Sequence, residues 1–227
     1  KTLGPPEVAA AALSCLAKGN SKMQDKISDA KGIAPLVAML SLSGGTVEGQ
    51  QAAGDCVATL AADSSRCQAL IAKAGGIPPL VELLVHGKTP THKHAAHALA
   101  MLASDEDNKM QIAHAGGIAP LVGLLSTGEP KTQEYASKAL EFLASDCVEN
   151  QVALVQEKAW QPLVALLGSE SAETQESAAA ALLCLASHAD SRNVVVKRVV
   201  ATLEDKSTAA QLKAAEALAV LSSRSAT

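Results

Sequence analysis

Histidine and cysteine are the side chains of this sequence with the most informative chemistry, because both bind metal ions and take part in catalysis. Four of the six histidines are His86, His92, His94 and His97. His94 and His97 are three residues apart, so on a helix they share a face and could bind one metal ion. A zinc site needs a third suitable ligand, which the neighbouring Lys93 cannot supply. We therefore expect a solvated helix face that responds weakly to pH, and no metal ion or cofactor.

The cysteines are the candidate nucleophiles, and they stand at positions 15, 56, 67, 147 and 184. Their number is odd and none forms a Cys-x-x-Cys pair, which argues against a disulfide framework or a zinc site. Cys67 and Cys147 fall where short helices are expected to begin, and a helix N-terminus can lower the pKa of a thiol. Neither has a partner histidine. We predict reduced thiols that fill the core, and hence an intracellular protein of the cytoplasm or nucleus.

The composition excludes several classes of function. A net charge of −4 without a basic cluster argues against nucleic-acid binding and against an electrostatic membrane patch. The longest apolar stretches, such as 178–186, are shorter than the roughly 18 residues of a membrane span. There is no Gly-x-Gly-x-x-Gly or Walker loop. We predict no enzyme activity; the less favoured alternative is an enzyme on an α-solenoid scaffold, against which the acidic balance and the 1% of aromatic residues count.

A repeated segment defines the elements that position these side chains. Gly75–Val81 returns as Gly116–Val122, and it has a counterpart before it at Lys31–Val37 and a weaker one after it at Lys158–Val164. The prolines of this segment stand at 35, 79, 120 and 162, so the steps are 44, 41 and 42. Such a period predicts a helical solenoid in which each unit buries its apolar face against its neighbours.

Glycine and proline divide each unit into three helices. In one unit we expect helices at 104–115 and 118–125, separated by a glycine pair, and a third from Pro130 to about Ala144. Residues 191–204 have no glycine stop, so two helices are expected to be fused there. The third helices share leucine pairs with i, i+3 spacing, which predicts a buried column: Leu13/Leu16, Val57/Leu60, Leu99/Leu102, Leu140/Leu143, Leu182/Leu185 and Leu218/Leu221.

We expect one domain over 1–227. Its units are a partial repeat at 1–19, repeats at about 20–62, 63–104, 105–145 and 146–187, and a shortened last repeat at 188–227. The chain opens with only a third helix and closes without a polar capping helix. A fragment of a longer protein, or a chain whose ends meet neighbouring subunits, is therefore expected.

Three segments resemble the armadillo repeat. Gly-Gly-Ile-Pro-Pro-Leu-Val-Glu-Leu-Leu at 75–84 is similar to its second helix, 108–115 to its first and 95–103 to its third. The resemblance implies an all-α fold, a right-handed α-solenoid (superhelix) of three-helix repeats whose third helices line a concave groove. Family members, including importin-α and β-catenin types, generally bind other proteins in that groove and carry no catalytic machinery.

The sequence departs from the peptide-binding members of this family at the residues that hold the ligand. Their asparagine is replaced here by Cys15, Thr59, Met101, Phe142, Cys184 and Val220. Their tryptophan is replaced by Ala11, Asp55, His97, Lys138, Ala180 and Glu216. An amide can bond both the N–H and the C=O of an extended peptide, and none of these replacements can do so. Import of basic nuclear signals is therefore not expected.

The groove residues follow from counting along the third helices. The predicted partner-binding residues are Gln51, Asp55, Thr59, Lys93, His97, Met101, Glu134, Tyr135, Lys138, Phe142 and Glu176. Met101 and Phe142 are either apolar anchors for a partner or packing between adjacent helices. Trp160 takes a position that the repeat assigns to the core. We expect a protein-interaction scaffold or adaptor with a protein partner and no membrane insertion; the alternative is a constitutive subunit of a large assembly, held through its uncapped ends.

Overall fold

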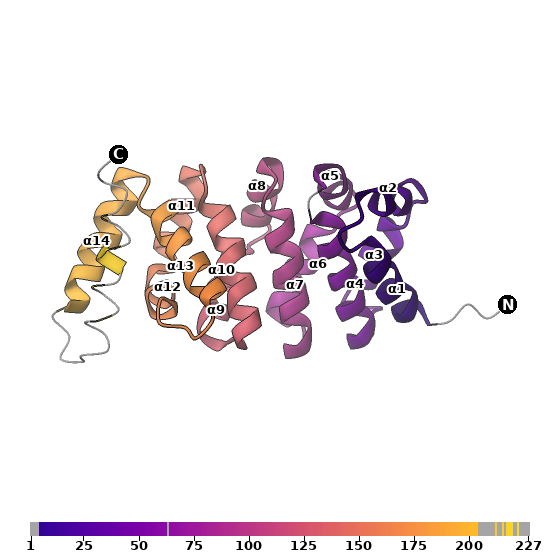
Figure 1. Ribbon diagram of the computed structural model, residues 1–227, viewed down its shortest axis with the longest axis horizontal. Coiled ribbons are helices and arrows are strands. Elements are labelled where there is room, and N and C mark those ends of the chain that lie inside the picture. Colours follow the sequence, from indigo (N-terminus) through magenta and orange to yellow (C-terminus); the bar gives the residue numbers. More distant parts are fainter. Residues whose placement is uncertain are drawn as a thin grey trace. The chain divides into compact units, whose positions relative to one another are not determined.

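The described part of the computed structural model consists entirely of helices and the short turns between them, with no strand (Figure 1). It comprises residues 5–62 and 64–203, together with positions 212, 215, 217–219 and 222. The chain divides into two compact units, Lys1–Pro120 and Leu121–Thr227. Each unit is described by itself.

In the first unit, three long helices pack side by side. These are α1, α4 and α7, and α4 contacts both of the others. Shorter helices cover two of these three: α3 packs on α4, and α6 packs on α7. The helices are α1 Pro6–Ala17, α2 Ser21–Asp29, α3 Ile33–Met39, α4 Val47–Ala61, α5 Ser65–Lys73, α6 Ile77–His86, α7 Thr89–Leu102 and α8 Glu106–His114. Helix α9, Ile118–Thr127, begins in this unit and ends in the next.

The second unit repeats the arrangement. Helix α10 packs along α13, and α12 packs on α13. The helices are α10 Pro130–Ala144, α11 Val148–Gln156, α12 Trp160–Leu166, α13 Ala172–Leu185 and α14 Ala189–Leu203. Helix α14 is continuous over 15 residues, which confirms that two helices are fused where the glycine stop is missing.

Glycine and proline set the helix ends as predicted, with small differences. Helix α8 begins at Glu106, because the Asp105 carboxylate accepts a hydrogen bond from the backbone N–H of Asn108 at 3.1 Å. Gly116 ends α8 with a φ of 80°, a left-handed conformation that glycine adopts without a Cβ penalty. Lys31 and Lys158 take the same place with φ of 59° and 57°.

The predicted leucine column is confirmed in α4, α7, α10 and α13, where both members of each pair are buried. It is wrong in α1, because Leu13 is half-buried and Leu16 is 55% exposed. In α4, α7 and α13 the pair is covered by the second helix of the same repeat, which is α3, α6 or α12, and no described helix takes that place on α1. In the last pair, Leu218 is half-buried. Its partner Leu221 lies outside the described residues, as do Glu216 and Val220.

Buried glutamines connect neighbouring third helices, which the repeat pattern did not reveal. Nε2 of Gln68, on α5, donates to the carbonyls of Ala61 at the end of α4 and Met101 at the end of α7, at 2.9 and 3.1 Å. Gln24 links α1 to α4 in the same way, and Gln151 links α10 to Ser187 beyond α13. The C-terminus of a helix leaves carbonyls without partners inside the helix. Gln24 and Gln68 each satisfy carbonyls at the ends of two helices at once.

Candidate functional site

The predicted partner-binding residues lie on the long third helices and are partly open to solvent. Ten of the eleven are half-buried, and Glu176 is exposed. In the first unit these residues come from α4 and α7, and in the second from α10 and α13. Their surroundings differ between the two units.

In the first unit, Asp55 is the centre of a hydrogen-bonded group. Ser14 on α1 donates to Asp55 Oδ2 at 2.9 Å, and the Ser14 and Thr59 hydroxyl oxygens are 3.0 Å apart. The Thr59 hydroxyl also donates to the Asp55 carbonyl at 2.9 Å. Asp55 and Thr59 therefore link α1 to α4, and the Asp55 side chain still remains 49% exposed. Sequence reasoning missed Ser14. Its only indication in the sequence is that it precedes Asp55 and Thr59 by 41 and 45 residues, about one repeat.

His94 joins this group from α7, and the prediction of a solvated histidine is wrong there. Its side chain is only 18% exposed, and its Nδ1 lies 3.9 Å from Asp55 Oδ1. Burial lowers the pKa of His94 below 6.5, and nearby Lys93 lowers it further, while Asp55 raises it. Helix α4 approaches closely because Gly54 faces His94, where an added Cβ would lie 3.0 Å from the His94 Cβ.

Among the candidate nucleophiles, Cys56 and Cys67 are buried and Cys147 is half-buried. Within the described residues, no three His, Cys, Asp or Glu side chains are placed to hold a metal ion. Cys67 is fully buried, with its sulfur 3.2 Å from the Ser28 hydroxyl, and Cys147 is half-buried at the N-cap of α11. Burial raises the pKa of Cys56 to about 12, with a further contribution from Asp55.

In the second unit, α10 carries the same three-residue arrangement twice. Lys131 pairs with Glu134 at 2.6 Å, and its Nζ lies 5.2 Å from the centre of the Tyr135 ring. Seven residues later, Lys138 pairs with Glu141 at 3.1 Å, and its Nζ lies 4.8 Å from the centre of the Phe142 ring. Each lysine is therefore held by a carboxylate and an aromatic face.

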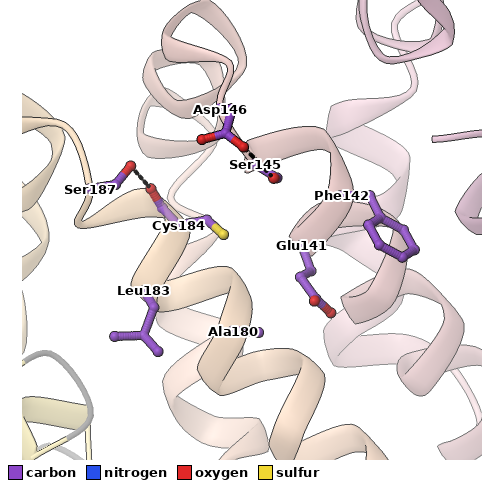
Figure 2. A pocket seen from close by; sticks show the side chains of 8 residues that line it. All are labelled: Glu141, Phe142, Ser145, Asp146, Ala180, Leu183, Cys184 and Ser187. Atoms are coloured by element: carbon purple, nitrogen blue, oxygen red, sulfur yellow. Dashed lines mark hydrogen bonds between the residues drawn. The ribbon is translucent and has the colours of Figure 1, made fainter. Parts of the chain in front are cut away.

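A cavity of about 330 Å³ lies beside the second of these arrangements, between α10 and α13 (Figure 2). Glu141 and Phe142 project from α10. Cys184 and Ala180 form the facing wall on α13. The cavity is lined by Glu141, Phe142, Ser145, Asp146, Ala180, Leu183, Cys184 and Ser187. Of the predicted residues, Phe142 alone lines it, and sequence reasoning missed Glu141 and Asp146.

Trp160 differs from its counterparts in the repeat. Ile33, Ile77 and Ile118 are at most 6% exposed, whereas Trp160 is half-buried. An indole is larger than the space an isoleucine fills, so only part of the ring is covered. The prediction of a core position for Trp160 is therefore correct only in part.

No single described helix is long and apolar enough to cross a membrane. One bent pair, α5 with α6, reaches the required length and composition only when its two helices are taken together.

Comparison with known proteins agrees with this architecture. Residues 64–104 and 105–145 match the family model of the armadillo/β-catenin-like repeat. No curated protein matches the chain. A crystal structure of an engineered protein is 31% identical, covers 98% of this chain and 93% of its own, and has a TM-score of 0.81.

Two designed proteins are also similar. A designed armadillo repeat protein in complex with the peptide (KR)4 is 26% identical over 94% of this chain and 92% of its own, with a TM-score of 0.78. A computationally designed armadillo repeat protein for modular peptide recognition is 25% identical with the same coverage and TM-score. Together with the helices in threes, these matches define an all-α solenoid of armadillo type. The chain belongs to the armadillo repeat family.

Proposed function

We propose that this protein is a non-catalytic scaffold that binds a protein partner along its third helices. The observation that carries the proposal is the row of half-buried polar and aromatic side chains on α10, which borders a cavity. Aromatic and charged groups that are partly desolvated are typical of binding hot spots. The similar designed proteins bind or recognise peptides, which supports a protein or peptide ligand here. Reduced cysteines favour an intracellular location.

The test is a variant that removes two side chains of the proposed binding surface but none of the fully buried core. Partners captured from the native source are identified by mass spectrometry and titrated by calorimetry against the wild type and against the double variant Lys138→Glu with Phe142→Ala. We expect the double variant to bind at least about tenfold more weakly while its free energy of unfolding stays within about 1 kcal/mol.

The matched control is Lys73→Glu with Val152→Ala. It makes the same charge reversal and also truncates an apolar side chain, on first helices α5 and α11, where Lys73 is exposed and Val152 is 40% exposed. This control should leave the affinity unchanged. Equal affinities for the wild type and the Lys138–Phe142 double variant would remove these third-helix residues from the interface.

A second candidate function is a constitutive subunit of a larger assembly, and the exposed face of α1 favours it. Val8 is 60% exposed, and Leu16 is 55% exposed although its equivalents in the other third helices, such as Leu102, are buried. Exposed apolar surface is common at protein interfaces. Sedimentation velocity separates the two candidates. A free adaptor sediments as a single monomeric species, whereas an assembly subunit self-associates, and Leu16→Glu should reduce that association.

A further inference from the structure

The cavity of the second unit already has a cation at its edge. Lys138 Nζ lies 3.1 Å from Glu141 Oε2 and 4.8 Å from the centre of the Phe142 ring. Both groups attract positive charge, one by its carboxylate and the other by the negative face of its ring. Glu141 and Phe142 line the cavity, whereas Lys138 does not.

The ion pair leaves the carboxylate incompletely satisfied. Glu141 Oε2 is shielded from water and has no hydrogen bond, although Lys138 Nζ lies 3.1 Å away. A buried carboxylate oxygen without a donor is costly. An arginine guanidinium presents five N–H donors in a planar fork that fits a carboxylate and also stacks on aromatic faces.

The remaining walls suit a long side chain that ends in a cation. Ala180 and Leu183 are apolar and can contact methylene groups. Asp146 supplies a second carboxylate at the rim, and Ser145 donates to its Oδ2 at 3.3 Å. The volume of about 330 Å³ leaves room for a side chain from outside.

We infer that this cavity binds an arginine side chain of the partner protein, and that Lys138 is a built-in competitor for the same carboxylate and ring. This inference rests on the proposed function and names the chemistry of the partner. In the free protein, Lys138 holds the cation position. The incoming guanidinium takes over Glu141 and Phe142, and Lys138 turns toward solvent, where its side chain is already 39% exposed.

The first motif of α10 provides a matched control for Lys138. Lys131 has the same spacing from a glutamate and an aromatic ring and also pairs with that glutamate, yet Lys131, Glu134 and Tyr135 do not line the cavity. Lys131→Met therefore changes the net charge as Lys138→Met does. Glu149→Gln, at an exposed residue of the first helix α11, changes it as Glu141→Gln does.

The experiment measures fluorescence anisotropy of a labelled peptide of alternating serine and arginine, and of the same peptide with neutral citrulline in place of arginine. We expect Lys138→Met to bind the arginine peptide about three- to fivefold more tightly, because a weak ion pair and a ring contact no longer compete. Glu141→Gln should bind it about tenfold more weakly, because a charge-assisted hydrogen bond is lost. Lys131→Met and Glu149→Gln should stay within about twofold of the wild type.

The following results would contradict the inference, and each identifies the part that is wrong. Equal effects of Lys138→Met and Lys131→Met would show that only net charge matters. Equal affinity for the arginine and citrulline peptides would exclude a cation site. If the natural partner loses affinity for the Lys138–Phe142 double variant but these peptide results fail, the arginine assignment is wrong and the proposed function stands. If neither the peptide nor any protein binds, both are wrong.

Discussion

At the scale of single residues, the group around Asp55 shows how one histidine can respond to pH. His94 is largely buried against α4, close to one carboxylate and next to one lysine in its own helix. Burial and Lys93 disfavour the protonated ring more strongly than Asp55 favours it, so the pKa of His94 falls below 6.5. The unfolded chain therefore binds this proton more readily than the folded chain does.

The consequence is a loss of stability in mild acid. As the pH falls through about 6.5 toward the lower pKa of folded His94, the unfolded state is protonated first, and the free energy of unfolding decreases. Above that range the contribution is fully present. Urea unfolding between pH 7.5 and 5.5 should show this decrease, and His94→Gln should flatten it. His86→Gln, a change at an exposed residue of α6, should leave the slope unaltered; an equal effect of both variants would exclude His94 as the source.

At the scale of helices, the glutamines of the first helices hold neighbouring third helices together. Gln68 donates to Ala61 and Met101 and also reaches the Ser104 hydroxyl at 2.8 Å. Gln68→Met keeps the length of the side chain but removes the donor, so two C-terminal carbonyls lose a partner. We expect the free energy of unfolding to fall by about 1–3 kcal/mol, measured by urea denaturation.

The control for this change is Gln161→Met, at an exposed position of α12. It should change the free energy of unfolding by less than about 0.5 kcal/mol. Similar costs at the two positions would mean that the bonds of Gln68 contribute nothing net to stability.

The helices were more predictable than the contacts between them. Gly116 and Pro130 act on the backbone next to them, so the ends of α8 and the start of α10 could be derived from local rules. Gln68 bonds Met101, a residue 33 positions away, and no local rule connects them. The same holds for Glu141, which lines the cavity because α13 packs beside α10. The third-helix face was therefore predictable as a surface, whereas its hydrogen bonds and its cavity were not.

At the scale of the whole molecule, each repeat buries its apolar face only where a neighbour covers it. The sequence marks Leu16 and Leu102 as equivalent, since both are the second leucine of a third helix. Leu102 is completely buried, with α6 packed on its helix, and Leu16 is 55% exposed. The difference comes from what covers α1, which a repeating pattern alone does not encode.

These two leucines allow the contribution of covering helices to be measured in one protein. Leu102→Ala leaves a cavity in the core and should lower the free energy of unfolding by about 2–5 kcal/mol. Leu16→Ala removes the same atoms from a largely solvated position and should cost less than about 1 kcal/mol. Urea denaturation with unchanged m-values checks both. A cost for Leu16→Ala that equals the cost for Leu102→Ala would mean that another copy or another part of the protein covers α1 in solution, which would favour the assembly subunit over the free adaptor.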